Sequence, residues 1–237
     1  MRYAFALPLA ASLLAASPLC AQSVLFNFEN ATLYMPFPLD LTVGGITAHF
    51  TGTGAGYSIQ NSATVGQPVG FSGKCVFPSG GPMADIIVSY SKPLTSFSIL
   101  YATYELDCDC SSTVKVTAYM DATVVGSNTM SAVPGGVWPS ATLSFSSTTP
   151  FNKVVVHYLQ GPQCPQCDYG PMIMADNMQV TPAAGPPGDL NGDTHVNAAD
   201  LAILLGAWGT NNPAADLNGD GVVGGADLAT LLGAWTG

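Results

Sequence analysis

Two short acidic segments near the C-terminus repeat one pattern of oxygen-bearing side chains. Residues 189–200 read DLNGDTHVNAAD, and residues 216–227 read DLNGDGVVGGAD. Aspartate occupies positions 1, 5 and 12 of both segments, and asparagine occupies position 3. A Ca²⁺ ion takes about six to eight oxygen ligands, which a twelve-residue loop presents from positions 1, 3, 5, 7, 9 and 12. The spacing therefore predicts two calcium-binding loops.

The predicted ligand sets of the two loops differ at one position. Position 9 is asparagine in the first loop, whereas Gly224 in the second loop has no side chain and leaves that place to water. Position 7 contributes a main-chain carbonyl in both loops. The first set is Asp189, Asn191, Asp193, His195, Asn197 and Asp200. The second set is Asp216, Asn218, Asp220, Val222 and Asp227.

The sharp turn at position 6 favours glycine, because it requires a backbone conformation that other residues adopt at a cost. Gly221 meets this requirement in the second loop. Thr194 takes the same place in the first loop, where we expect it to strain the turn and weaken the site. Position 8 is valine in both copies, and we expect Val196 and Val223 to pair as a short β-bridge between the loops.

Each loop runs into a segment whose apolar residues recur at helical spacing. The predicted helices would bury one shared core that contains Leu201, Leu204, Leu205, Trp208, Leu228, Leu231, Leu232 and Trp235. All acidic side chains after residue 187 stand at loop positions, and this region has no Lys or Arg. Because like charges repel, folding should depend on a bound cation. A disordered acidic tail, the alternative, would not show this strict spacing.

Two such loops, each followed by a single helix, resemble a type I dockerin at residues 189–237. The resemblance implies two bound Ca²⁺ ions and docking onto a cohesin-like protein domain, in a polysaccharide-degrading assembly or at a cell surface. Well-studied members carry a Ser/Thr-type contact pair at loop positions 10 and 11. This chain has Ala198-Ala199 and Gly225-Ala226 there. The resemblance therefore extends to the calcium sites and leaves the identity of the partner open.

The N-terminus has the features of a secretory signal peptide over residues 1–21. Arg2 precedes an apolar run at residues 4–16, which is too short to span a membrane. A lipoprotein anchored through Cys20 is an alternative, although the residues before it fit such a site poorly. We expect a secreted, extracellular or surface-associated protein without a membrane span. The formal net charge of −10 makes nucleic acid an unexpected partner.

Five cysteines follow the signal peptide, and export predicts disulfide bonds among them. The disulfide candidates are two closely spaced pairs, Cys108, Cys110, Cys164 and Cys167. Cys75 is left over or exchanges into one of the bridges, because connectivity does not follow from sequence. The alternatives are a zinc site built from four thiolates and a thioredoxin-like redox role for the second pair.

Residues 22–181 consist of short β-type runs separated by Gly, Pro, Ser, Thr and Asn clusters. The predicted strands are residues 24–28, 45–50, 57–60, 84–90, 94–101, 113–120, 141–145, 153–158 and 173–180. Strands of this number and spacing favour an antiparallel, jelly-roll-like β-sandwich. Residues 182–188 are rich in Pro and Gly and form a stiff linker to the small α-helical unit. The chain is therefore predicted to be mainly β.

The first and last predicted strands resemble those of galactose-binding-like jelly rolls, the fold of many carbohydrate-binding modules. Residues 26–30 (FNFEN) and 175–180 (ADNMQV) carry this resemblance. It implies a third, structural Ca²⁺ at Glu29 and Asp176; ordinary solvent or turn roles are the alternative. Trp138 stands in a loop-like PGGVWP context and is the candidate ligand-binding aromatic, with packing in the core as the alternative.

We assign no catalytic residues. Hydrolysis of a glycosidic bond takes two facing carboxylates. Glu105, Asp107 and Asp109 alternate and would share one face of a strand, but a solvated loop beside a disulfide is the simpler interpretation. No Gly-x-Ser-x-Gly elbow surrounds any serine. His49 and His157 lie in apolar β runs, where we expect paired or edge-facing side chains.

The leading hypothesis from the sequence is a secreted, non-catalytic binding protein. Its β-sandwich would recognise a polysaccharide or cell-surface glycan, and its dockerin would tether it to a partner in polysaccharide breakdown or surface assembly. One alternative is a glycoside hydrolase that acts on O-glycosyl bonds and carries a dockerin. Another is a structural or adhesive surface protein without a sugar ligand.

Overall fold

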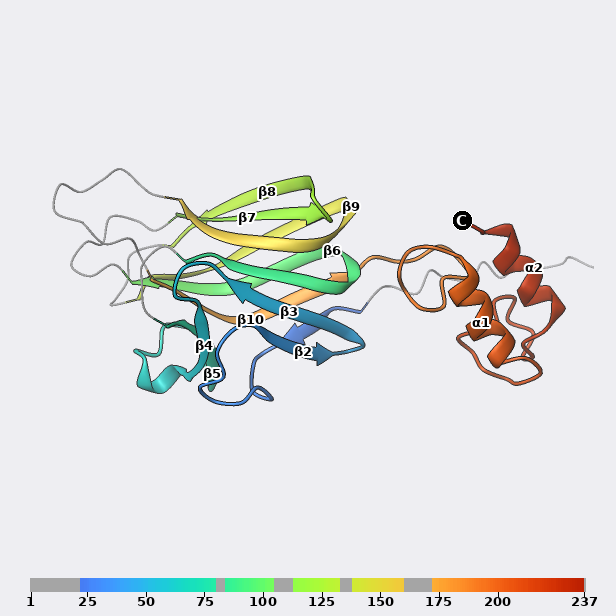
Figure 1. Cartoon of the computed structure of the whole chain (residues 1–237), viewed down its shortest axis with the longest axis horizontal. Coiled ribbons are helices and arrows are strands. Elements are labelled where there is room, and N and C mark those ends of the chain that lie inside the picture. The colour runs from blue at the N-terminus through green and yellow to red at the C-terminus, as the bar shows by residue number, and fades with distance from the viewer. Residues whose placement is uncertain (1–21, 80–83, 105–112, 133–137, 160–171, 237) are drawn as a thin grey trace, which may run out of the picture.

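The computed structural model describes residues 22–79, 84–104, 113–132, 138–159 and 172–236, which form a β-sandwich and a small helical unit (Figure 1). Several predictions concern residues outside these ranges. They are the signal peptide at residues 1–21, the acidic residues Glu105, Asp107 and Asp109, and the disulfide candidates Cys108, Cys110, Cys164 and Cys167. Among the described helices, none has the length and apolar character needed to cross a membrane.

Ten strands occur in the described part of the sandwich, and all their pairings are antiparallel. They are β1 (Val24–Phe26), β2 (Leu39–Val43), β3 (Ile46–Gly52), β4 (Tyr57–Asn61), β5 (Lys74–Pro78), β6 (Ile86–Tyr104), β7 (Thr113–Met120), β8 (Thr123–Ser131), β9 (Ser140–Leu159) and β10 (Met172–Pro182). A short 3-10 helix (Ser62–Thr64) follows β4. The mainly β fold predicted for this region is confirmed.

The long strands β6 and β9 each take part in both layers of the sandwich, because their two halves pair with different strands. The first part of β6, from Ile86 to Ser89, pairs with β3 and with the C-terminal half of β9. After a register shift between Ser89 and Leu94, β6 pairs with β10 and with the N-terminal half of β9. One layer therefore contains β2, β3, β7 and β8, and the other contains β1, β4, β5 and β10.

Alternating residues of these strands fill the space between the layers. In β7, for example, Val114, Val116 and Ala118 are fully buried, whereas the residues between them are partly exposed. The ring of Phe50 packs edge-on against Phe28, with ring centroids 5.5 Å apart. Burial of large apolar side chains is the main stabilising contribution to such a core.

The helical unit contains two helices of equal length, α1 (Ala198–Gly206) and α2 (Gly225–Gly233). Asn197 begins α1, because its side chain accepts a hydrogen bond from the amide of Ala199 at 2.8 Å. The Asp200 carboxylate in turn accepts the amide of Asn197 at 2.9 Å, which completes a reciprocal cap. Asp200, which holds the last ligand position of the loop, thus also helps to cap the helix.

The shared core of the helical unit is smaller than predicted. It consists of Val196, Leu204, Ala207, Ala215, Val223 and Leu231, with other apolar side chains partly buried around it. Four residues predicted for this core are exposed instead, namely Leu205, Trp208, Leu232 and Trp235. A short helix that meets one neighbour buries only one narrow stripe, and consecutive residues point about 100° apart around its axis.

The two position-8 valines do not form the predicted bridge with each other. The carbonyl of Val223 accepts a hydrogen bond from the Gly209 amide at 2.8 Å, and its amide donates to the Thr210 carbonyl at 2.8 Å. The carbonyl of Val196 accepts the Thr236 amide at 2.9 Å. Each loop is therefore tied to the end of the helix from the other repeat.

Candidate calcium loops and docking surface

Three carboxylates of the first loop converge on one point. One oxygen from each of Asp189, Asp193 and Asp200 lies within 4.8 Å of the others. Asp200 is fully buried, and its Oδ1 accepts hydrogen bonds from the amides of Leu190 and Asn191 at 2.8 and 3.1 Å. These amides fix the orientation of the Asp200 carboxylate within this cluster.

Asp189 sets the path of the first loop. Its Oδ1 accepts the amides of Gly192 and Asp193 at 2.7 and 3.1 Å, and its Oδ2 accepts the amide of Thr194 at 2.8 Å. Side-chain acceptors of this kind wrap the following backbone around themselves. The loop is consequently shaped around the same carboxylate that the sequence assigns as the first ligand.

The second loop repeats these contacts bond for bond. Asp216 accepts amides at 2.8, 3.1 and 2.8 Å from Gly219, Asp220 and Gly221. Asp227 is fully buried and accepts amides at 2.7, 3.1 and 2.7 Å from Leu217, Asn218 and Gly224. The predicted equivalence of the two segments therefore extends to their hydrogen bonds.

Hydrogen bonds keep carboxyl groups of both loops in the ionised form. The Gly224 amide, followed by the amides of Asn218 and Leu217, lowers the pKa of Asp227. Desolvation raises the pKa of Asp193, but hydrogen bonds from the His195 amide and other donors outweigh it and leave this pKa lowered. Ionised carboxylates are the hard oxygen ligands that Ca²⁺ prefers. The donor set of each loop therefore fits this ion.

Position 6 differs between the loops, and this difference gives a testable prediction. Thr194 has a φ of 71° and Gly221 has a φ of 91°, both in the left-handed region. Because a β-branched residue is strained there, we expect Thr194→Gly to tighten calcium binding in the first loop about 3- to 10-fold. Calorimetric titration of the full chain measures the two affinities. The matched change Gly221→Thr should weaken the second loop, and unchanged titrations in both variants would contradict the argument.

Two acidic loops, each followed by one helix and tied to the other repeat, define a duplicated calcium-loop module. Residues 187–233 match the family model described as "Dockerin type I domain". The C-terminal unit of this chain is therefore a type I dockerin, as its sequence resemblance predicted. A comparison of the whole chain with curated proteins found no similar sequence.

Solved structures similar to the sandwich include adhesin and carbohydrate-binding domains. The K1 cleaved adhesin domain of Lys-gingipain from Porphyromonas gingivalis W83 matches with a TM-score of 0.39 and 16% identity, covering 68% of this chain and 99% of that one. A family 35 carbohydrate-binding module from Clostridium thermocellum gives a TM-score of 0.32 and 17% identity, covering 69% and 100%. A variant of a family 29 carbohydrate-binding module gives a TM-score of 0.33 and 12% identity, and the match covers 68% of this chain and 92% of that one. Similarity at this level carries no inference about a ligand.

The dockerin exposes large apolar side chains at equivalent positions of its two repeats. Leu205 and Leu232 are 52% and 51% exposed, and Trp208 and Trp235 are 47% and 42% exposed. We call these four residues the apolar helix surface. Exposed apolar side chains mark a protein contact site where they gather in one patch, so these four residues are candidates for contact with a partner. The residues at loop positions 10 and 11 are also exposed, at the start of each helix.

Glu29 and Asp176, which are far apart in sequence, lie beside the same short segment, residues 72–74. Oε1 of Glu29 accepts the Lys74 amide at 2.8 Å, and Oδ2 of Asp176 accepts the Ser72 amide at 3.2 Å. Asp176 is fully buried, at a bulge of β10. The structure thus brings together the two acidic residues that the weaker resemblance singled out, and calcium binding there stays a prediction.

Trp138 is half-buried beside β5. Its ring packs edge-on against Phe77, with ring centroids 6.4 Å apart, and it borders a small cluster that includes Phe71 and Cys75. Cys75 is a buried free thiol, and burial, together with the nearby acidic groups, raises its pKa to about 12. Part of the Trp138 ring is therefore used for packing, and its role as a ligand contact stays a prediction.

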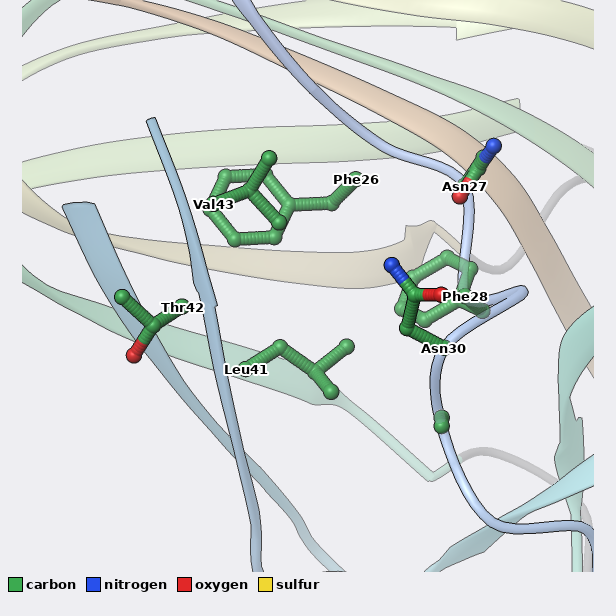
Figure 2. Close-up of a pocket in the computed structure, with 8 residues that line it drawn as sticks. Phe26, Asn27, Phe28, Asn30, Leu41, Thr42 and Val43 are labelled. Carbon is green, nitrogen blue, oxygen red and sulfur yellow. The ribbon is translucent and has the colours of Figure 1, made fainter. Parts of the chain in front are cut away.

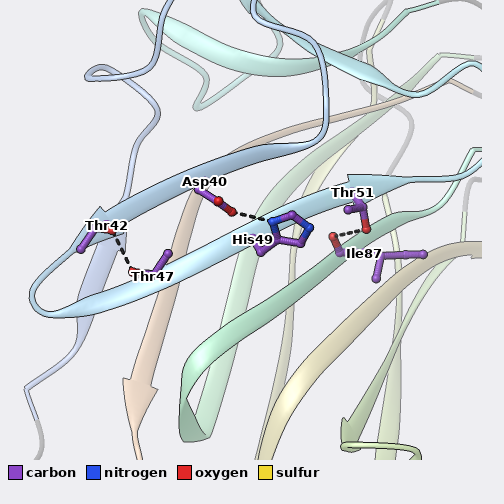
Figure 3. A network of polar contacts seen from close by, with 6 residues as sticks. All are labelled: Asp40, Thr42, Thr47, His49, Thr51 and Ile87. Carbon is purple, nitrogen blue, oxygen red and sulfur yellow. Dashed lines mark hydrogen bonds and ion pairs between the residues drawn. The ribbon is translucent and has the colours of Figure 1, made fainter. Parts of the chain in front are cut away.

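Two His–Asp pairs were not identified from the sequence. His49 Nδ1 lies 2.5 Å from Asp40 Oδ1 across the β2–β3 pair, beside a Thr42–Thr47 contact (Figure 3). His157 Nδ1 lies 2.6 Å from Asp85 Oδ1. The β2–β3 register predicts the first pair once the hairpin is known, whereas only the tertiary fold creates the second. Both histidines are paired, as expected.

A small cavity opens between the end of β1 and strand β2 (Figure 2). It is lined by Phe26, Asn27, Phe28, Asn30, Ala31, Leu41, Thr42 and Val43. Its volume of about 40 Å³ is far below the several hundred Å³ of ordinary ligand pockets. We therefore do not assign it as a ligand site.

Proposed function

We propose that the chain is a secreted, non-catalytic binding protein whose dockerin tethers a glycan-binding β-sandwich to a cohesin-like partner. The observation that carries this proposal is the type I dockerin at the C-terminus, which implies cohesin-mediated tethering. The exposed apolar helix surface supports it, because such side chains gain stability when a partner covers them.

We further propose one Ca²⁺ ion in each dockerin loop. The matching hydrogen-bond frames around Asp200 and Asp227 support two equivalent sites. The carbonyls of His195 and Val222 would supply the position-7 ligands. The bound ions would neutralise the acidic loops and fix the orientation of the helices that carry the apolar helix surface.

The described carboxylates of the sandwich are all engaged in contacts within the protein. Each makes a hydrogen bond within the protein, and the set is Glu29, Asp40, Asp85, Asp121 and Asp176. A glycosidase instead needs two carboxyl groups that face its substrate. Among the described residues, these contacts support structural roles for the acidic side chains.

Binding to insoluble polysaccharides tests the role of the sandwich. After the mature chain is mixed with a panel of such polysaccharides and sedimented, we expect protein in the pellet and no sugar in the supernatant. Trp138→Ala should weaken retention about 5- to 10-fold if its ring stacks on the sugar. Tyr34→Ala is the matched control, because Tyr34 is an exposed aromatic residue elsewhere on the sandwich.

The other outcomes of this experiment distinguish the alternative functions. Release of soluble sugar would identify a glycoside hydrolase, and Glu105, Asp107 and Asp109 would then be changed to find its carboxylates. Absence of both binding and release, combined with self-association, would identify a structural or adhesive protein. Equal retention of Trp138→Ala and the wild type would remove Trp138 from the binding site.

A further inference from the structure

Lys74, one of only five Lys and Arg residues in the chain, reaches from the start of β5 to the segment that follows β1. Its Nζ donates hydrogen bonds to the carbonyl oxygens of Glu29 and Ala31, both at 2.7 Å. Both carbonyl oxygens therefore hold the Lys74 ammonium group in one fixed position. A surface lysine would keep its ammonium group in water.

Two carboxylates lie next to this contact. The Glu29 carboxylate accepts the main-chain amide of Lys74 itself, and the Asp176 carboxylate accepts the amide of Ser72. Burial raises the pKa of Asp176 to about 6, and the negative charge of Glu29 adds to this rise. Both carboxylates therefore lie against residues 72–74, the segment that carries Lys74. We call the carbonyls of Glu29 and Ala31 and these two carboxylates the oxygen cluster.

An oxygen cluster with two negative charges is stabilised by a cation, which can be a metal ion or an ammonium group. We propose that the Lys74 ammonium group takes the place of this cation at the two carbonyl oxygens, so that the β-sandwich folds without a metal ion. Lys74 joins the end of β1 to β5 through a bond that a chelator cannot remove. The inference does not rest on the proposed function.

The test uses the full mature chain with the two dockerin tryptophans replaced, Trp208→Phe and Trp235→Phe. Trp138 is then the only tryptophan, and its half-buried ring reports on the sandwich. We expect the thermal midpoint measured by its fluorescence to change by less than about 1 °C between calcium and EGTA. In the same background, Lys74→Met should lower this midpoint by roughly 5–10 °C, because two carbonyl oxygens lose their charged donor.

Lys115→Met is the matched control, since it removes a lysine from β7 without touching the oxygen cluster. We expect it to move the midpoint by less than about 2 °C. A fall of about 5 °C or more in EGTA with Lys74 in place would overturn the proposal and favour a calcium ion in the sandwich. Equal midpoints for Lys74→Met and Lys115→Met would also overturn it. If Lys74→Met does not fold, the EGTA comparison still decides between the two cations.

Discussion

Chelation of calcium should unfold the dockerin. Six aspartates lie in the two loops, and no Lys or Arg follows residue 187 to offset them. At a calcium concentration of about 100 times the dissociation constant, each bound ion stabilises the folded unit by about 2.7 kcal/mol. Without calcium, a core built from so few buried residues cannot offset the repulsion and the entropy of ordering both loops.

Circular dichroism of the isolated segment, residues 188–237, measures this effect. We expect its helical signal to appear with micromolar-to-millimolar calcium and to disappear with EGTA. Asp200→Ala and Asp227→Ala each remove a buried carboxylate that also holds three amides, so the double variant should stay unfolded at any calcium concentration. A segment that remains helical in EGTA, or one that never becomes helical, would refute calcium-dependent folding.

Loss of the apolar helix surface should abolish docking without unfolding the dockerin. Leu205 and Leu232 are more than half exposed, so Leu205→Asp and Leu232→Asp leave the buried core intact. In a complex, however, each aspartate would bury a charge against an apolar partner. We expect the double variant to bind a cohesin domain recognised by the wild type at least about 100-fold more weakly.

The duplicated structure makes the single variants informative. If either repeat can dock, Leu205→Asp and Leu232→Asp alone should each weaken binding only a few-fold. Ile203→Asp is the matched control, because Ile203 is also exposed on α1 but points roughly to the opposite side of the helix from Leu205. Undiminished binding of the double variant, measured by calorimetry in calcium, would place the docking site elsewhere on the dockerin.

The sequence was sufficient for the dockerin loops because their information is local. Ligand spacing, the capping position and the helix start all lie within twelve consecutive residues, and the structure repeats these contacts in both copies. The prediction of which leucines are buried was right for Leu204 and Leu231 and wrong for Leu205 and Leu232. Leu204 and Leu205 have the same hydrophobicity, but only the packing of α1 against the other repeat decides that the first is buried and the second exposed.

The β-sandwich class was also predictable, since the apolar residues of most strands alternate. Strands β2, β5 and β8 were missed. Strand β8 is largely exposed along its length and lacks this alternation. The predicted strands at residues 84–90 and 94–101 form the single long β6, which changes layer at its register shift. The change of layer depends on which strands pair with each half of β6, and these partners are distant in the sequence.

By itself, the sequence determined the two-part organisation of this protein and the chemistry of its calcium loops, because both follow from residue types at short, fixed spacing. Only the tertiary structure decided which contacts form between distant segments. It exposed Leu205, Leu232 and both dockerin tryptophans, paired His157 with Asp85, and placed the Lys74 ammonium group against carbonyls more than 40 residues away. Contacts of this kind are made by strand pairing and helix packing, which bring together residues that no local pattern connects.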